Sequence, residues 1–335
     1  FVYGAKEPHG PYERGSGIKA GFNPDDLVLT PNHTVVSDKV KSDLLDYFLE
    51  LEWFDTQLGQ IIEILRESGE LDNTLVLVTA DNGSPVPGSK SNLYDLGTHV
   101  PMIVVWPGKI APGRVVDDLV SQIDYAPTFL EVAGIEPPAE ITGKSFVDLL
   151  LSGESGRLDP SREFVLAAQE KGSHLRDNHL GYPMRSIRTH EYRYIRNFKP
   201  ERWPRGNGPK PGEELPTDRW SVQRPAEELF KITDDPYCLN NLAGDEAYAD
   251  VLAELRNKLE QELRAQSDPR ILGYGDIYES FPRHMSFKPG LEGFKERGEY
   301  NPDYLMEIPP EILVSDLYYQ ALEQKQEQTQ RDSGH

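Results

Sequence analysis

The sequence predicts an α/β layered domain followed by a smaller domain built on an antiparallel sheet. A long amphipathic helix precedes an apolar, β-branched segment at 73–79, and a second apolar segment follows at 101–106. After about residue 155, short alternating strands replace these longer elements. Helices that alternate with apolar strands are typical of layered α/β domains. We therefore expect residues 1–155 to form part of an α/β domain and 156–335 to form a smaller C-terminal domain.

The elements of the first domain follow from periodicity and punctuation. Residues 1–4 open on an apolar Phe-Val-Tyr run that suggests the end of a strand, and a Gly- and Pro-rich loop follows. Ser37 is placed to cap an amphipathic helix over 38–68. The unbroken β-branched run at 73–79 predicts a buried parallel strand. The remaining expected elements are a polar loop at 80–100, a strand at 101–106 and short helices at 124–133 and 145–151.

The second domain is predicted to combine short strands with one long helix. Tyrosine and arginine alternate over 192–197, which is typical of an antiparallel sheet with one covered face. Leucines at helical spacing predict a helix over 246–266. The other expected elements are strands at 163–168 and 184–188, a Pro-, Gly- and charge-rich loop at 199–226 and an irregular tail from 268.

Composition excludes several classes of protein. A net charge of −21 argues against general nucleic-acid binding, which needs a basic surface. No run approaches the ~18 apolar residues of a transmembrane helix. The single cysteine, Cys238, allows no internal disulfide. The chain opens without an initiator methionine, and we interpret this as a start partway through a domain, so any targeting segment would lie upstream.

Asp81 and Asn82 follow the first predicted strand, in the run Thr-Ala-Asp-Asn-Gly at 79–83. Open α/β sheets bind ligands at the carboxyl ends of their strands. A carboxylate and an amide oxygen are hard ligands that suit Ca²⁺ or Mg²⁺. Taken alone, a plain turn after a strand explains the same two residues.

The sequence around this pair extends the pattern. Lys90 is followed by Tyr94, Asp95 and Gly97, and then by a strand that closes on the run Trp-Pro-Gly-Lys at 106–109. Together with an Asp-Tyr-Ala-Pro-Thr run at 124–128, this motif set resembles the type I sulfatases of the alkaline-phosphatase superfamily. The resemblance covers about residues 1–270. It implies that the first domain is part of an alkaline-phosphatase-like α/β/α sandwich.

The resemblance also implies roles for four residues. Asp81 and Asn82 would complete a Ca²⁺ site, with Mg²⁺ as the alternative, whose other ligands are an Asp pair that this chain lacks. Lys90 matches the lysine that contacts the sulfate and the leaving-group oxygen, where an ammonium neutralises developing charge. His9, in the run Pro-His-Gly-Pro-Tyr, matches a histidine of the sulfate pocket. It would donate a hydrogen bond to a sulfate oxygen or protonate the leaving group.

A later segment is similar to one branch of the family. The run Gly-Tyr-Pro-Met-Arg-Ser at 181–186 resembles the heparan N-sulfatases, and we expect His174 and Arg185 to contact the substrate. The planar guanidinium of arginine suits a carboxylate or a sulfate. In the alternative interpretation, Arg185 and Arg188 only line a solvated strand face. Residues 228–243 resemble a closing motif of the family and are interpreted as scaffold, with Cys238 as a structural thiol.

The chain departs from the family at the nucleophile. Type I sulfatases use a formylglycine made from the Cys or Ser of a Cys/Ser-x-Pro-Ser-Arg motif, and this chain has none. The run Leu-Asp-Pro-Ser-Arg at 158–162 has leucine at the nucleophile position, and Cys238 lacks the following Pro and Arg. We expect the formylglycine upstream, in a missing N-terminal part of the same polypeptide. The isolated chain is therefore predicted to be inactive.

The preferred function is hydrolysis of a sulfate ester or sulfamate on a sulfated glycan. The alternatives are a phosphatase, phosphodiesterase or phosphonate hydrolase of the same superfamily, and a non-catalytic glycan-binding domain. Asp-Asn-Gly favours one hard divalent ion and hence a sulfatase. N-sulfoglucosamine is the best single substrate guess, although the sequence does not separate S–N from S–O cleavage. A periplasmic or secreted location is expected because sulfated glycans are extracellular, and the oligomeric state is left open.

Overall fold

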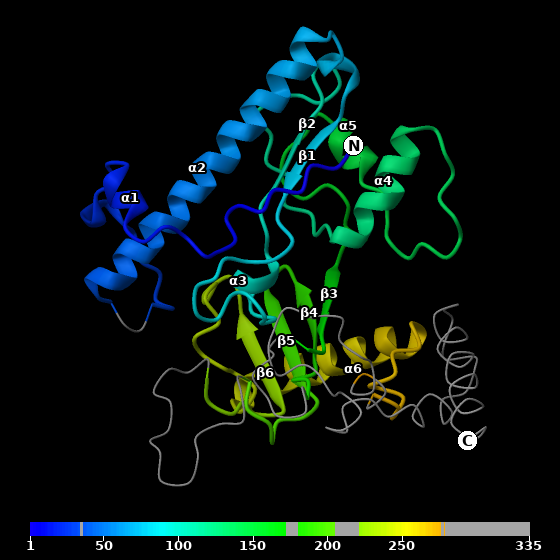
Figure 1. Ribbon diagram of the computed structural model, residues 1–335. Helices are drawn as coiled ribbons and strands as arrows, with labels where there is room; N and C mark the ends of the chain where they lie inside the picture. Colours follow the sequence, from blue (N-terminus) through cyan, green and yellow to red (C-terminus); the bar gives the residue numbers. More distant parts are fainter. Residues whose placement is uncertain (34–35, 172–179, 205–220, 276–277, 279–335) are drawn as a thin grey trace, which may run out of the picture. The chain divides into compact units, whose positions relative to one another are not determined.

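The computed structural model describes residues 1–33, 36–171, 180–204, 221–275 and 278 (Figure 1). These residues fall into two compact units. Unit 1 contains residues 1–90 and 99–163, and unit 2 contains residues 91–98 and the chain from Phe164 onward. The segment 91–98, which the sequence places inside the first domain, is thus part of unit 2, together with its short helix α3 (Asp95–Thr98).

The longest element of unit 1 is helix α2 (Asp38–Glu67), which confirms the predicted amphipathic helix. Its N-terminus is capped by Ser37, whose Oγ accepts a hydrogen bond from the Val40 N–H at 3.3 Å. Gly69 follows the C-terminus with a φ of 75°, a left-handed conformation that glycine adopts without steric cost. Leu45 and Asp46 are its two buried residues.

The sheet of unit 1 consists of β1 (Val76–Thr79) and β2 (Met102–Val105), which pair antiparallel. In Figure 1 this pair lies between α2 on one side and α4 (Tyr125–Val132) and α5 (Val147–Leu151) on the other. This layering confirms the predicted α/β class and both short helices. The short elements that complete the unit are α1 (Ser16–Lys19) and the 3₁₀ turns at Pro24–Asp26, Leu71–Asn73 and Gln122–Asp124.

Two strand predictions in unit 1 need correction. The run at 73–79 suggested a parallel strand, but its partner among the described residues is antiparallel, and all four β1 residues are only half-buried. A β-branched run reports strand propensity and burial, and it carries no information on strand direction. Residues 1–4 form no strand, and Phe1 and Val2 are fully exposed. An apolar run becomes a strand only where a neighbouring strand completes its hydrogen bonds.

Unit 2 is built on a four-stranded antiparallel sheet in the order β3-β4-β5-β6. Three of these strands confirm predictions, and α6 confirms the predicted helix. The elements are β3 (Phe164–Gln169), β4 (Met184–Thr189), β5 (Tyr192–Asn197), β6 (Glu227–Lys231), a 3₁₀ turn at Glu246–Tyr248 and α6 (Ala249–Ala265).

The two faces of this sheet pack against different elements. On one face, the leucines of α6 form a buried cluster with one apolar residue from each of three strands, Ile187, Tyr194 and Leu229. On the other face, Leu93 and Tyr94 of the segment 91–98 pack into a second cluster. Because side chains alternate along a strand, each strand contributes to both clusters. Within the described ranges, no helix has an apolar stretch long enough to cross a membrane.

Candidate functional site

The loop that begins at Thr79 is fixed at its start by neighbouring backbone. The Thr79 hydroxyl donates a hydrogen bond to the Pro101 carbonyl at 2.9 Å, and the Gln122 side chain donates to the Ala80 carbonyl at 2.8 Å. These contacts tie the end of β1 to the start of β2 and to the turn before α4. Asp81, the next residue, is exposed, and Asn82 is half-buried.

Asn82 presents its amide in a defined direction. Its Nδ2 donates to the Gly83 carbonyl at 2.8 Å, so its Oδ1 is the atom that can serve as a ligand. A carboxylate beside an amide oxygen fits a hard cation such as Ca²⁺, which takes six to eight oxygens. Among the residues that the structure describes, no group of three or more His, Cys, Asp or Glu side chains could hold a metal ion. The pair can therefore supply only part of a coordination shell.

Lys90 closes the same loop. Its backbone N–H donates to the Ser84 carbonyl at 3.1 Å, and the Ser89 N–H donates to the Val86 carbonyl at 3.2 Å. The loop is also anchored from outside, because the buried Asn32 donates from Nδ2 to the Pro87 carbonyl at 3.3 Å. The Lys90 backbone thus contacts Ser84, which is two residues after Asn82. Asp81, Asn82 and Lys90 therefore share one closed loop.

His9 lies on an exposed turn of unit 1. Its Nδ1 is 2.7 Å from the Gly10 carbonyl oxygen, and its backbone N–H donates to the Lys6 carbonyl at 2.8 Å. The turn is closed by Tyr12, whose hydroxyl donates to the Pro8 carbonyl at 2.8 Å. The roles of His9, Asp81, Asn82 and Lys90 as a set stay predictions.

Arg185 has a different environment from the predicted one. Its side chain is buried and forms ion pairs with Asp268 (Nε–Oδ2, 2.7 Å) and Glu170 (Nη2–Oε1, 2.7 Å). Its Nη1 also donates to the Met184 carbonyl at 2.9 Å. Although burial acts to lower the pKa of Arg185, these carboxylates hold it above the usual value. Substrate contact by Arg185 stays a prediction, and the two ion pairs count against it. His174 lies outside the described residues.

The alternative, a solvated strand face, is wrong for Arg188. Arg188 and Arg193 are directly paired across β4 and β5, and both donate to Asp95 Oδ1, at 3.2 Å and 3.0 Å. All three side chains are at most 14% exposed. Burial lowers the pKa of Arg193, and Asp95 opposes that effect. Local sequence patterns do not reveal this anchor, because it links residues almost a hundred positions apart.

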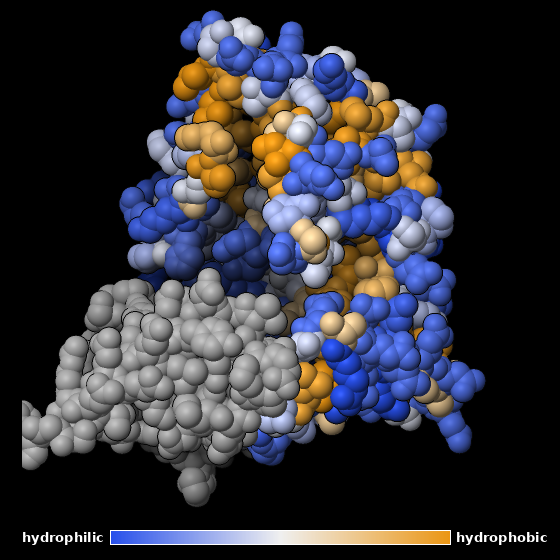
Figure 2. Space-filling model, turned by 90° about the vertical axis from the view of Figure 1, so that its right-hand side faces the viewer, coloured by the Kyte–Doolittle hydropathy of each residue, from blue (hydrophilic) through white to orange (hydrophobic). Residues whose placement is uncertain are grey.

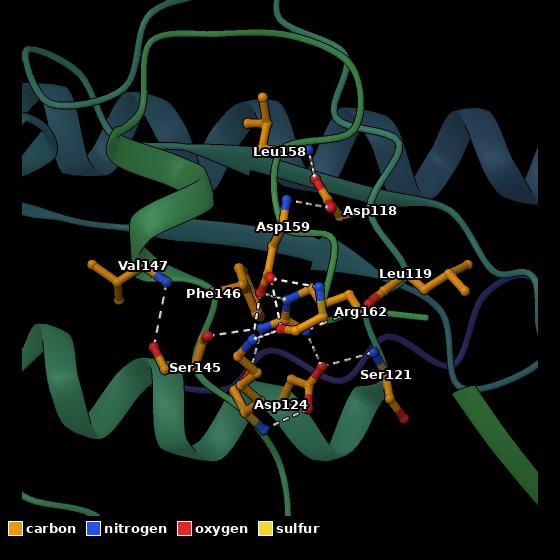
Figure 3. Close-up of polar contacts among 12 residues, drawn as sticks. Asp118, Leu119, Ser121, Asp124, Ser145, Phe146, Val147, Leu158, Asp159 and Arg162 are labelled. Carbon is orange, nitrogen blue, oxygen red and sulfur yellow. Dashed lines mark hydrogen bonds and ion pairs between the residues drawn. The ribbon is translucent and has the colours of Figure 1, made fainter. Parts of the chain in front are cut away.

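The run at 158–162, which carries the Pro-Ser-Arg of the nucleophile motif, has a structural role (Figure 3). Arg162 is buried, and its Nη1 donates to Asp124 Oδ2 at 2.9 Å. Its Nη2 donates to the Lys144 and Ser145 carbonyls at 2.9 and 2.7 Å. Asp124 also accepts from the Lys144 N–H at 2.8 Å. Arg162 therefore joins three segments of unit 1.

The thiol of Cys238 is also structural. It is buried in the cluster that contains Leu93 and Tyr94. Burial raises its pKa to about 12, so the reactive thiolate is scarcely populated near neutral pH. This environment agrees with the scaffold role predicted for residues 228–243.

Comparison with known proteins gives these residues a context. Residues 2–135 match the family model described as "Sulfatase", and residues 89–204 match "N-sulphoglucosamine sulphohydrolase, C-terminal". The chain is 29% identical over 264 residues to an ulvan-active sulfatase of Formosa agariphila, covering 71% of this chain and 41% of the relative. It is 28% identical over 304 residues to human N-sulphoglucosamine sulphohydrolase, covering 82% and 59%.

A solved structure shows the same fold. The structure of a protein in complex with its substrate D-glucosamine-2-N,6-O-disulfate matches with a TM-score of 0.55 at 23% identity, covering 71% of this chain and 45% of that one. At this identity, the likeness concerns the fold alone. Across these comparisons, the chain spans about half the length of the proteins it matches.

Proposed function

We propose that this chain, which belongs to the sulfatase family and has its alkaline-phosphatase-like fold, is part of an enzyme that hydrolyses sulfate esters or sulfamates on sulfated glycans. One observation carries the proposal. The family match over residues 2–135 runs through all four predicted site residues of unit 1, namely His9, Asp81, Asn82 and Lys90. The relatives include an ulvan-active sulfatase and an N-sulphoglucosamine sulphohydrolase, which supports a sulfated sugar as substrate.

The side chains of this unit suit the charge changes of the reaction. Hydrolysis breaks the bond between sulfur and the sugar oxygen or nitrogen, forms a bond from sulfur to a water oxygen, and leaves the sugar atom protonated. Lys90 supplies a positive charge for the sulfuryl oxygens and the leaving atom, where negative charge develops. His9 donates a hydrogen bond to a sulfate oxygen, or the proton that the leaving atom takes up.

A hard cation is proposed at the start of the loop. Asp81 and the Oδ1 atom of Asn82 would hold Ca²⁺, with Mg²⁺ as the alternative, and the remaining ligands would come from outside the described residues. Such an ion supplies charge neutralisation for a bound sulfate. The Asn82 geometry supports this assignment. Its Nδ2 donates a hydrogen bond to the Gly83 carbonyl, so Oδ1 is the side-chain atom that remains to coordinate a cation.

The nucleophile is proposed to be a formylglycine outside these 335 residues. The sequence has no Cys/Ser-x-Pro-Ser-Arg motif. The two partial matches within the chain have other roles. In the run at 158–162, Arg162 joins segments of unit 1, and Cys238 is a buried thiol with a raised pKa. We further propose a periplasmic or secreted location, where sulfated glycans are found.

The test is sulfate release by the complete polypeptide that carries this chain. The protein is purified, and mass spectrometry of its peptides establishes whether a formylglycine is present. Sulfate is then measured by ion chromatography with ulvan fragments, O-sulfated glucosamine and N-sulfoglucosamine. Release from any of them supports the proposal. Release of phosphate from phosphate or phosphonate esters in place of sulfate would refute it, as would glycan binding without turnover by formylglycine-bearing protein.

A further inference from the structure

A buried carboxylate in unit 1 holds a segment that follows the turn with His9. Asp46, in the N-terminal third of α2, is 1% exposed. It accepts hydrogen bonds from the N–H groups of Gly15 and Gly17, at 2.8 and 2.9 Å, and from the Ser16 hydroxyl at 3.4 Å. A buried charge is costly unless donors compensate it. These three donors do so, and they fasten the segment 15–17 to α2.

The fit between this segment and α2 leaves no free space. A Cβ atom added to Gly17 would lie 2.4 Å from the carbonyl carbon and oxygen of Leu45. Real Cβ atoms do not approach backbone so closely. The segment therefore lies directly on the α2 backbone at Leu45 and Asp46, and its position is set by α2.

Tyr47, the next residue of α2, contacts the turn that carries His9. The ring of Tyr47 packs edge-on against the ring of Tyr12, with centroids 6.3 Å apart. The Tyr12 hydroxyl donates to the Pro8 carbonyl at 2.8 Å. Asp46 and Tyr47 thus hold the chain on the C-terminal side of His9. Through its hydrogen bond, Tyr12 also fixes Pro8, the residue just before His9.

The ring of His9 has one defined tautomer in this arrangement. Its Nδ1 lies 2.7 Å from the Gly10 carbonyl oxygen, and a carbonyl oxygen only accepts. The Nδ1 atom must therefore carry a proton, and Nε2 is the atom left to act on a ligand. In the neutral ring Nε2 can only accept a hydrogen bond. His9 can donate to a sulfate oxygen or give a proton to a leaving atom only when the ring is doubly protonated, and the proton then comes from Nε2, because Nδ1–H is engaged by Gly10.

We propose that Asp46 and Tyr12 are positioning residues, which fix the turn and the Nδ1–H tautomer of His9 so that Nε2 faces the substrate. The part that concerns substrate rests on the proposed function. The part that concerns tautomer and turn does not, and it can be measured separately. The same geometry explains why an acidic residue stands among the apolar residues of α2.

The first test measures the His9 ring directly. Histidine labelled with ¹⁵N is incorporated into the complete polypeptide, and a His9→Gln variant assigns the signals of His9. We expect the wild-type signals of the neutral ring to show a protonated Nδ1 and an unprotonated Nε2, and Tyr12→Phe and Asp46→Asn to give a mixture of tautomers. Tyr12→Phe keeps the ring contact with Tyr47, so it tests the hydroxyl without removing the packing.

The matched control is Asp118→Asn. Asp118 is 8% exposed and accepts from the N–H groups of Leu158 and Asp159 at 2.7 and 2.8 Å, so it is chemically similar to Asp46 but supports a different segment. We expect it to lower stability without changing the His9 signals. Signals unchanged in Tyr12→Phe and in folded Asp46→Asn would overturn the proposal, and so would an equal change in Asp118→Asn.

Activity provides the second test. Displacement of a catalytic group by about 1 Å can cost about 100-fold in rate, so we expect Tyr12→Phe to lower kcat by up to this factor with little change in KM. A higher KM with unchanged kcat would contradict a positioning role. A wild-type protein that releases no sulfate would refute the proposed function, whereas the ¹⁵N signals would still decide whether Asp46 and Tyr12 fix the ring.

Discussion

The two units differ in where their apolar side chains lie. Unit 2 buries two clusters, one on each face of its sheet. In unit 1, the buried apolar residues among those described are Leu45, Pro127, Phe146 and Leu149. Within the described ranges, the exposed large apolar residues all belong to unit 1, among them Trp53 and Ile64 of α2 and Ile103 of β2. Figure 2 shows apolar areas among polar ones on the surface.

The charged side chains described above also differ in their exposure. In unit 2, Arg185, Arg193 and Arg270 are buried, and each contacts a carboxylate. In unit 1, the predicted site residues His9 and Asp81 are exposed. Buried charged residues stabilise both units, since Arg162 pairs with Asp124 in unit 1. The comparison teaches that the exposed residues predicted for the site lie in unit 1, the unit with fewer buried apolar residues.

The largest expected effect is on the buried anchor of unit 2. Asp95→Ala leaves Arg188 and Arg193 facing each other without their shared carboxylate, and like charges directly opposite destabilise a sheet. We expect the free energy of unfolding to fall by roughly 3–5 kcal/mol. Urea denaturation followed by circular dichroism measures it. A loss below about 1 kcal/mol would show that the buried charges of unit 2 are not structural.

The second effect is on activity and concerns unit 1. Lys90→Ala should lower kcat/KM of the complete polypeptide by about 10²–10³-fold, because the positive charge that we propose beside the sulfuryl group is lost. The free energy of unfolding should fall much less than in Asp95→Ala, because Lys90 is half-buried and Asp95 is buried. Sulfate release and urea denaturation of the same preparations give both numbers. Loss of activity together with loss of stability would instead assign Lys90 a structural role.

A smaller effect concerns the pH dependence of unit 2. Glu227 accepts two hydrogen bonds from Arg256, at 2.6 and 2.8 Å, and this interaction lowers the pKa of Glu227 below its ordinary value of 4.5. A carboxyl with a lowered folded-state pKa stabilises the fold above the ordinary pKa and loses that contribution as the pH falls through the folded-state pKa.

Glu227→Gln tests this dependence. The wild type should be more stable than the variant at pH 7, and the difference should shrink as the pH is lowered below 4.5. Thermal unfolding at a series of pH values measures it. A stability difference that does not vary with pH would show that the pair acts through packing alone.

The smallest effect is expected at a surface ion pair of unit 1. Lys144 pairs with Asp159, and the Lys144 side chain is 55% exposed. Exposed ion pairs contribute at most about 1 kcal/mol. Lys144→Ala should therefore change the free energy of unfolding by less than this, and salt titration should remove most of the difference. A loss as large as that of Asp95→Ala would remove the contrast between buried and exposed charges.

The sequence predicted the elements better than their partners. Period and capping located α2 and α6, because both signals lie within the element itself. The direction of β1 was predicted wrongly, because a β-branched run does not specify which strand lies beside it. Similarly, a short window cannot show that Asp95 belongs to unit 2, since its partners are 93 and 98 residues away.

For the candidate site, the sequence predicted which residues to consider, but it did not predict the contacts that they make. The runs around Asp81 and Lys90 carried the family resemblance, and the family models match both regions. The pairing of Arg185 with Asp268 was not predictable, because it joins a strand to a residue 83 positions later. Asp46 offered a usable signal, an acidic residue between two leucines and two aromatic residues in an amphipathic helix.

The buried thiol of Cys238 has a practical consequence. It is the single cysteine of the chain and lies in the core cluster of unit 2, with a pKa of about 12. A maleimide or iodoacetamide reagent can reach it only when that cluster opens. The alkylation rate of Cys238, followed by peptide mapping, therefore reports the opening of unit 2 without an engineered probe, and it can follow this core while ligands are added.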